Sequence, residues 1–110
     1  MTSLGTASYG TVPQGSRIGQ DLVISNTGGE FHTFTEVAAF GAGCAPEIND
    51  LLGLVGPPVA DCAEAFSDPR TALPPGATGR VATQEMSKGV HRFMCMIHPW
   101  MHTEVEVRRR

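Results

Sequence analysis

Basic residues are scarce in this sequence of 110 residues, which contains a single lysine, Lys88. Three of its seven arginines are the last three residues, so residues 1–107 carry five basic and eleven acidic side chains, a formal charge of −6. A nucleic-acid-binding protein needs a basic patch along its contact surface. The charge pattern therefore excludes nucleic acid as a partner, and the terminal arginines indicate a solvated chain end.

Long apolar runs are also missing, since no stretch approaches the roughly 18 apolar residues that a membrane span requires. The chain is instead rich in turn formers, with 13 glycines and 8 prolines. This composition rules out a helical bundle or a coiled coil and favours short strands joined by turns. We therefore expect one all-β domain spanning residues 1–110, a length that suits a single core.

Strand-like segments lie in two groups, before and after an irregular region. A β-branched segment at 21–26 ends in the turn signal Asn26-Thr27-Gly28-Gly29, and 31–37 is its expected hairpin partner. Residues 1–16 are small and polar and predict an irregular arm or a weak edge strand. The later predicted strands are 78–83, 89–95 and 103–107. Several short strands separated by turns are typical of a sandwich or barrel.

The irregular region is an excursion over residues 41–70. Pro46 suits the first turn of a short helix, and Gly53 suits its end. Asp61 is placed to cap a second helical turn over 61–66. The excursion is too short to be a domain of its own, so we expect it to lie between strands of the same fold.

Three cysteines leave at least one unpaired. Cys44 and Cys62 flank the excursion, and a bridge between them would close a loop of about 19 residues and contribute on the order of 3 kcal/mol. The alternative is two free buried thiols. A disulfide implies an oxidising compartment. Because no charged residue precedes Arg17, the chain does not begin like a signal peptide, and we expect a processed periplasmic or extracellular protein.

Cys95 is the unpaired cysteine, and its neighbours carry the candidate chemistry. A thiol, an imidazole and a thioether follow one another at three-residue intervals, at Cys95, His98 and Met101. Thiolate and imidazole suit copper, zinc or iron, and a thioether adds weak, soft ligation that favours copper over zinc. One more imidazole would complete a trigonal set of two histidines and one cysteine with an axial methionine, the arrangement of blue-copper electron-transfer sites.

His32 is the best candidate for that second imidazole. Of the other histidines, His91 shares a strand face with Cys95 but lies about 13 Å away at strand rise. His102 directly follows Met101, and adjacent residues of a strand point to opposite faces. His32 belongs to a different predicted strand and is far enough away in the sequence to cross the sheet.

This ordered set resembles the cupredoxin family of type 1 blue-copper proteins. In that family an early strand supplies a histidine after a turn, which 26–35 matches, and a later glycine-led strand ends in the cysteine, which 89–101 matches. Leu73-Pro74-Pro75-Gly76 and Val105-Glu106-Val107 match as well. The short Cys-x-x-His-x-x-Met loop is similar to that of amicyanin-like and plastocyanin-like members. The likeness does not include the excursion.

The resemblance implies a cupredoxin-like Greek-key β-sandwich or barrel that binds one copper ion. His32, Cys95 and His98 would form the trigonal plane, with Met101 as the axial ligand. The backbone at Thr33 would tie the two ligand segments together and tune the sulfur of Cys95. The alternatives are a surface position for His32 and plain core packing for Met101. The resemblance also implies a small, soluble, monomeric one-electron carrier that is not an enzyme.

Such a carrier would dock redox proteins at an apolar patch around the edge of His98. Pro99 and Trp100 flank that residue and are expected to form the exposed patch, unless Trp100 is buried and closes the end of the sandwich. The alternative function is a copper carrier or chaperone, which the methionines near the site and His102 would favour. A metal-free interaction module is a third hypothesis, against which the intact ligand set argues. Three other methionines are expected to be packing residues rather than a copper relay: Met86, Met94 and Met96.

Overall fold

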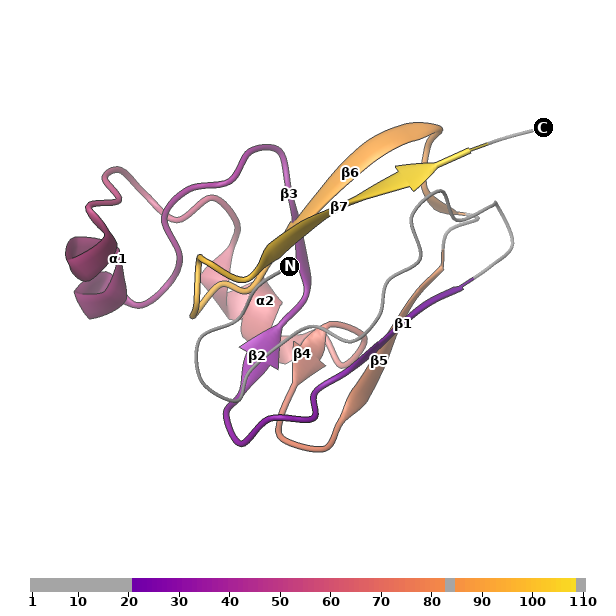
Figure 1. Cartoon of the computed structure of the whole chain (residues 1–110), viewed down its shortest axis with the longest axis horizontal. Coiled ribbons are helices and arrows are strands. Elements are labelled where there is room, and N and C mark those ends of the chain that lie inside the picture. Colours follow the sequence, from indigo (N-terminus) through magenta and orange to yellow (C-terminus); the bar gives the residue numbers. More distant parts are fainter. Residues whose placement is uncertain (1–20, 83–84, 109–110) are drawn as a thin grey trace.

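Short strands make up most of the regular structure in the computed structural model, which describes residues 21–82 and 85–108 (Figure 1). The strands are β1 (Asp21–Ser25), β2 (His32–Thr33), β3 (Thr35–Val37), β4 (Ala72–Leu73), β5 (Thr78–Ala82), β6 (Gly89–Met94) and β7 (His102–Val107). The helices are α1 (Pro46–Leu52) and α2 (Cys62–Ser67). The fold is thus mostly β with short helices, as the composition predicts. The predicted arm at 1–16 lies outside the described residues.

The strands form small antiparallel sheets, and they close into no barrel over residues 21–82 and 85–108. β1 pairs with β5, β2 pairs with β4, and β6 lies between β3 and β7. Met94 lies opposite His102 in the β6–β7 pair, so residues 95–101 form the loop at that end of the sheet. None of the helices in these ranges is long and apolar enough to cross a membrane.

The predicted hairpin between 21–26 and 31–37 is wrong. β1 pairs with β5 instead, and the segment 31–37 divides into β2 and β3, which belong to different sheets. The division falls at Phe34, whose backbone N–H donates to the carbonyl of Thr71 and whose side chain is fully buried. Burial of this ring in the core takes precedence over pairing of the two neighbouring segments.

The main apolar core gathers side chains from both the β1–β5 sheet and the β3–β6–β7 sheet. On β7, Val105 and Val107 are buried and the glutamates beside them are exposed, as the alternating sequence predicts. Phe34 and Phe93 stack within the core, with ring centroids 4.3 Å apart. The buried members of this core are Leu22, Ile24, Phe34, Leu73, Met86, Phe93, Cys95, Met101, Val105 and Val107. Because two of these come from the 95–101 loop, that loop folds back onto the core.

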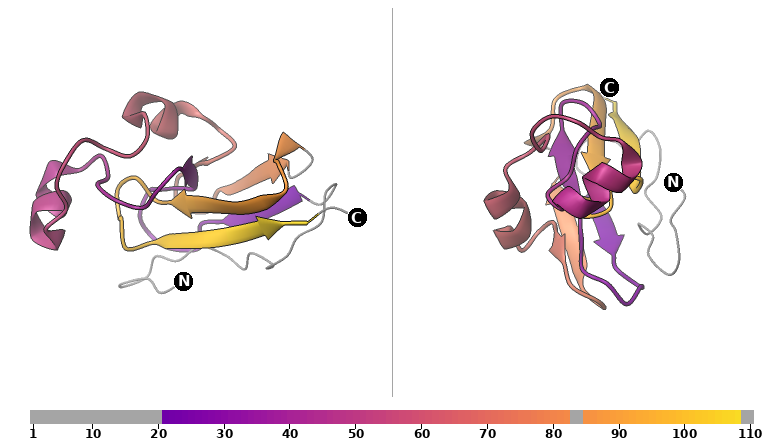
Figure 2. Two further views of the ribbon diagram at one scale, coloured as in Figure 1. Left: turned by 90° about the horizontal axis from the view of Figure 1, so that it is seen from above. Right: turned by 90° about the vertical axis from the view of Figure 1, so that its left-hand side faces the viewer.

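The excursion is held by the predicted disulfide between Cys44 and Cys62. α1 begins at Pro46 and is capped after Leu52 by Gly53, which adopts a positive φ of 69° that favours glycine. α2 is capped by the carboxylate of Asp61, which accepts a hydrogen bond of 3.0 Å from a backbone N–H in the first turn. Both helices therefore begin where the sequence predicts. Figures 1 and 2 show α1 projecting beyond the end of the sheets at which the β6–β7 loop lies.

Candidate metal centre

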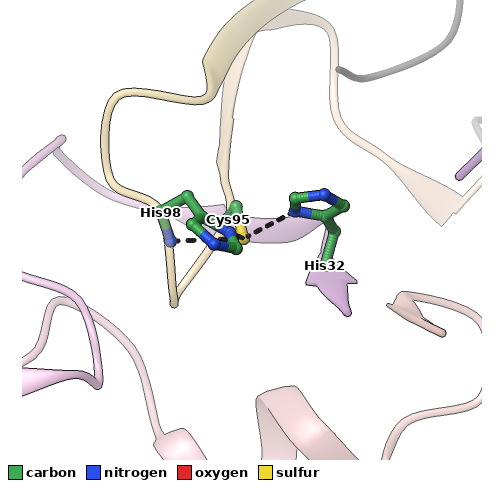
Figure 3. Close-up of side chains that lie close together, drawn as sticks. All are labelled: His32, Cys95 and His98. Carbon is green, nitrogen blue, oxygen red and sulfur yellow. Dashed lines mark hydrogen bonds between the residues drawn. The ribbon is translucent and has the colours of Figure 1, made fainter. Parts of the chain in front are cut away.

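Three of the predicted ligands meet in one buried cluster (Figure 3). His32 lies in β2, Cys95 directly follows β6, and His98 lies in the β6–β7 loop. The Nδ1 atoms of His32 and His98 lie 3.7 Å and 3.5 Å from Sγ of Cys95. The candidate ligand atoms of the three residues all lie within 4.8 Å of one another. The fold thus brings together side chains that are 63 positions apart in the chain.

Met101 lies nearby, on the same loop as Cys95 and His98. Its side chain is fully buried and shares a core cluster with Cys95. The backbone N–H of Cys95 donates to the carbonyl of Met101 at 2.9 Å, and the N–H of Met101 donates to the carbonyl of His98 at 2.9 Å. These two hydrogen bonds close the loop, so a thiol, an imidazole and a thioether share one buried neighbourhood.

Asn26 organises the turn that leads into β2. Its side-chain amide donates to the carbonyls of Glu30 and Leu73 at 2.6 Å and 2.8 Å, and its Oδ1 accepts from the N–H of Gly28 at 3.0 Å. Leu73 lies opposite His32 in the β2–β4 pair. Since one buried side chain binds both the turn and β4, it determines where His32 enters the cluster.

The sulfur of Cys95 accepts backbone hydrogen bonds from the N–H of Thr33 at 3.5 Å and from the N–H of His98 at 3.4 Å. Burial raises the pKa of the Cys95 thiol. The hydrogen bond with the His98 ring and the backbone N–H groups of Thr33, His98 and Ile97 outweigh burial, so the pKa lies below its usual value. The cluster therefore favours the thiolate, which is the form that binds a metal.

Thr33 also joins the two ligand segments through its side chain. Its Oγ1 accepts hydrogen bonds from the N–H of Met96 at 2.9 Å and from the hydroxyl of Thr35 at 3.0 Å. The sequence prediction assigned the linking role to the backbone of Thr33 and missed its hydroxyl. A hydroxyl residue directly after a candidate ligand histidine was the available signal. Because Met96 follows Cys95, this contact holds the cysteine segment against β2.

The two histidines lie in different electrostatic environments. The pKa of His98 lies above its usual value. The hydrogen bond with Cys95 raises this pKa, burial lowers it, and the charge of Glu30 raises it further. Burial lowers the pKa of His32, and the neighbouring His98 lowers it further. The Nε2 of His98 lies 3.5 Å from a carboxylate oxygen of Glu30. Glu30 was not predicted, although a carboxylate two residues before a ligand histidine was a usable signal.

The Nε2 atom of His32 is buried and has no hydrogen-bond partner among the described residues. A buried polar atom without a partner is unusual in a folded protein. The Nδ1 atom of the same ring faces the sulfur of Cys95. The ring is therefore oriented by its position in the cluster rather than by a hydrogen bond at its far side.

The remaining histidines are engaged elsewhere, in agreement with their exclusion from the predicted ligand set. The ring nitrogens of His91 lie 2.6 Å from a carboxylate oxygen of Glu36 and 2.7 Å from the carbonyl of Ser87. His102 is exposed and stacks on Phe40, with ring centroids 4.4 Å apart. The three methionines expected to be packing residues are all buried in apolar clusters: Met86, Met94 and Met96.

The exposed patch predicted at Pro99 and Trp100 is not formed as expected. Pro99 is buried, Trp100 is half-buried with its indole N–H inaccessible, and His98 is only 6% exposed. Trp100 packs edge-on against His98, with ring centroids 5.2 Å apart. The excursion packs against this loop, since a Cβ added at Gly43 would lie 3.1 Å from Cγ of Pro99. The exposure of Pro99 was predicted wrongly because no local pattern revealed that contact.

The spacing of the donors fits a metal ion. Metal–sulfur and metal–nitrogen bonds of about 2.3 Å and 2.0 Å in a trigonal plane place the two donor atoms about 3.7 Å apart. The observed separations of 3.7 Å and 3.5 Å agree with that value. Comparisons of the chain with protein-family models, curated proteins and solved structures find no match in any of the three. The cluster itself is therefore the basis for assigning a function.

Proposed function

We propose that this protein is a type 1 copper protein with a cupredoxin-like Greek-key fold, and that it carries single electrons between redox partners. The observation behind the proposal is the buried arrangement of two Nδ1 atoms, from His32 and His98, around the sulfur of Cys95. Met101 lies beside them on the same loop. Two imidazoles, a thiolate and a weak thioether form the donor set of blue-copper electron-transfer sites.

The donor set favours copper over zinc. Zinc in structural sites takes four strong nitrogen, sulfur or oxygen ligands in a tetrahedron. The described residues offer three such donors in this cluster. A thioether is a weak, soft ligand that suits copper, and we assign that role to Met101 because it is buried on the ligand loop. When bound, copper would supply a reversible one-electron couple.

The chain's own contacts support donors that are held before a metal arrives. The N–H groups of Thr33 and His98 orient the sulfur of Cys95, and the hydroxyl of Thr33 holds the N–H of Met96. The hydrogen bond between Cys95 and Met101 closes the loop. A site held in this way changes little in geometry between oxidation states, which favours rapid electron transfer. The hydrogen bonds to the sulfur also tune the reduction potential.

We propose a carrier rather than an enzyme. A copper enzyme that reduces oxygen or nitrite needs further histidines for a second copper centre, and His91 and His102 are engaged with Glu36 and Phe40 instead. The disulfide supports an oxidising compartment, so we propose a periplasmic or extracellular location. We also propose that the carrier is a monomer.

The alternative of a copper chaperone is less well supported. Metal delivery calls for accessible soft ligands from which copper can leave. Met94 and Met96 are instead fully buried, in a cluster with Val37 and Ala65. Their burial favours a site that retains its metal.

Visible absorption tests the proposal. One equivalent of Cu(II) added to the protein should produce an intense thiolate-to-copper band that bleaches with ascorbate and returns on reoxidation. Cys95→Ser should abolish the band because it removes the thiolate. His102→Ala should leave the band unchanged, because this exposed residue lies outside the cluster.

Two outcomes would count against electron carriage. A colourless protein that binds Cu(I) and releases it readily to a chelator would support the chaperone. Failure to take up copper would contradict the ligand assignment for His32, Cys95 and His98.

A further inference from the structure

The excursion exposes an apolar surface that the proposed site does not use. We call residues 41–62 the helical lobe. Within it, Leu51 is 85% exposed, Leu52 45% and Val55 91%, and α1 has no buried residue. Leucine and valine are mostly buried in soluble proteins. Three such side chains exposed within five positions mark a contact surface.

Acidic residues accompany these apolar side chains. Glu47 and Asp50 lie on α1 and Asp61 lies near the end of the lobe, and all three are exposed. The sequence has no lysine, arginine or histidine from residue 38 to residue 69. An apolar centre with a polar rim is the usual composition of a protein–protein interface. A rim of one charge favours a partner of the opposite charge.

The lobe is held in one conformation by its own contacts. Asn49 binds both backbone groups of Gly43, accepting from its N–H at 2.8 Å and donating to its carbonyl at 3.0 Å. The N–H of Val59 donates to the carbonyl of Ala42 at 3.0 Å, and the disulfide closes the base of the lobe. The exposed side chains therefore lie on a preorganised surface, which lowers the entropy lost on binding.

The lobe is bonded directly to the metal-binding loop. The N–H of Cys44 donates to the carbonyl of Met96, the residue after Cys95. One residue, Met96, and one hydrogen bond thus separate the candidate copper ligand Cys95 from the base of the lobe. Figure 2 shows α1 beyond the sheets, at the end where this loop lies. A partner on the lobe would dock beside the metal centre.

The edge of His98 offers a smaller apolar contact. His98 is only 6% exposed, Pro99 is buried, and the carboxylate of Glu30 lies 3.5 Å from Nε2 of His98. We propose that the helical lobe is the docking surface for a redox protein whose apolar contact patch is ringed by lysines or arginines. This inference rests on the proposed function as an electron carrier. Charge complementarity selects that partner, because the acidic rim of the lobe matches a basic rim.

Electron exchange with a basic redox protein tests this inference. The probe is a c-type cytochrome with lysines around its exposed haem edge. Stopped-flow absorption measures the second-order rate constant of electron transfer between the two proteins, in the thermodynamically favourable direction. The wild-type rate should fall as salt is added. The double variant Leu51→Ser, Val55→Ser and the single variant Asp50→Lys should each lower the rate by about fivefold. The side chains of Asp50, Leu51 and Val55 are all exposed, so these substitutions should not affect folding.

Matched substitutions on another surface serve as controls. Val90→Ser replaces an exposed apolar side chain, and Glu106→Lys reverses an exposed charge. These two residues lie opposite each other in the β6–β7 pair, away from the metal-binding loop. Both variants should keep the wild-type rate with the cytochrome. All variants should keep the blue band, and Asp50→Lys and Glu106→Lys should exchange electrons with hexacyanoferrate at equal rates.

Three outcomes would overturn the inference without touching the proposed function, provided that the blue band is intact. The lobe variants could react as fast as the controls. The wild type could react with hexacyanoferrate but not with the cytochrome. The wild type could also sediment as a dimer that Leu51→Ser with Val55→Ser converts to a monomer, which would assign the surface to a second copy of the chain. A wild-type protein without a blue band would contradict the proposed function instead.

Discussion

Thr33 directly follows His32 and binds the segment of Cys95 and Met96 with two different groups. Its backbone N–H donates to the sulfur of Cys95, and its hydroxyl accepts from the N–H of Met96. Thr33 and Met96 are both fully buried. If the hydroxyl of Thr33 is removed, the N–H of Met96 therefore has no water molecule to take its place. Valine has nearly the same shape as threonine but lacks the hydroxyl, which makes this contact separable from packing.

Thr33→Val should therefore destabilise the protein by about 1–3 kcal/mol, the usual cost of leaving a buried donor unpaired. Urea unfolding of the metal-free protein measures the change. In the copper-loaded protein the visible band should also shift, since the segment after Cys95 loses its anchor. Thr33→Ser keeps the hydroxyl and should retain the wild-type band. A valine variant as stable as the wild type would show that the hydroxyl contact contributes little.

At the scale of elements, an ion pair connects β3, β6 and the turn before β6. Glu36 lies on β3, opposite Phe93 of β6, and its carboxylate binds the ring of His91. The other ring nitrogen of His91 reaches the carbonyl of Ser87. The imidazole is nearly buried and the carboxylate is half-exposed. Protonation of one histidine is therefore linked to contacts among three segments.

This contact predicts a dependence of stability on pH. Burial lowers the pKa of His91, but the hydrogen bonds with Glu36 and Ser87 and the charge of Glu36 outweigh it, so the pKa lies above the ordinary 6.5. The folded state then binds the proton more tightly than the unfolded state. The stabilisation is complete below pH 6.5 and is lost as the pH rises through the folded pKa.

Urea unfolding across this pH range measures the loss. Comparison of the wild type with Glu36→Gln isolates the contribution of His91, because the other histidines are common to both proteins. The difference in unfolding free energy should shrink as the pH rises. Glu104→Gln, which alters another exposed pair on the same sheet, should not reproduce that trend. A difference that is constant with pH would contradict the assignment.

At the scale of the whole molecule, the excursion and the β6–β7 loop form one structural unit. The disulfide anchors the excursion, and the N–H of Cys44 joins it to the carbonyl of Met96. Gly43 lies so close to this carbonyl that a Cβ would come within 2.5 Å of the oxygen. The β6–β7 loop, which carries the candidate ligands, is therefore supported by a segment that lies outside the residues resembling the cupredoxin pattern.

Gly43→Ala should disturb both the helical lobe and the candidate metal centre. The added methyl group meets backbone atoms of Met96 and the ring of Pro99, so the chain must shift, at a cost of about 1–3 kcal/mol. Unfolding measurements and the visible band should both report the change. Gly29→Ala is the matched control, because its methyl group would meet nothing within 4 Å. Equal unfolding free energies and equal visible bands for the two variants would contradict close packing of the excursion on the β6–β7 loop.

Local patterns in the sequence predicted most of the elements and the candidate ligands, but not β4 or the division of 31–37 into β2 and β3. Pro46 and Gly53 delimit α1, and alternation predicts β7. The spacing of Cys95, His98 and Met101 places three donors on one short loop. Such signals depend on backbone preferences and on contacts a few residues apart, which each segment carries by itself.

Only the tertiary structure decided which segments meet. β1 pairs with β5, while Phe34 divides the segment 31–37 and enters the core. Pro99 is buried because the distant excursion packs against it, and Glu30 reaches His98 because the turn held by Asn26 is tied to β4. Sequence spacing limits the structures that a segment can form, whereas the free energy of burying shared surface selects its partners.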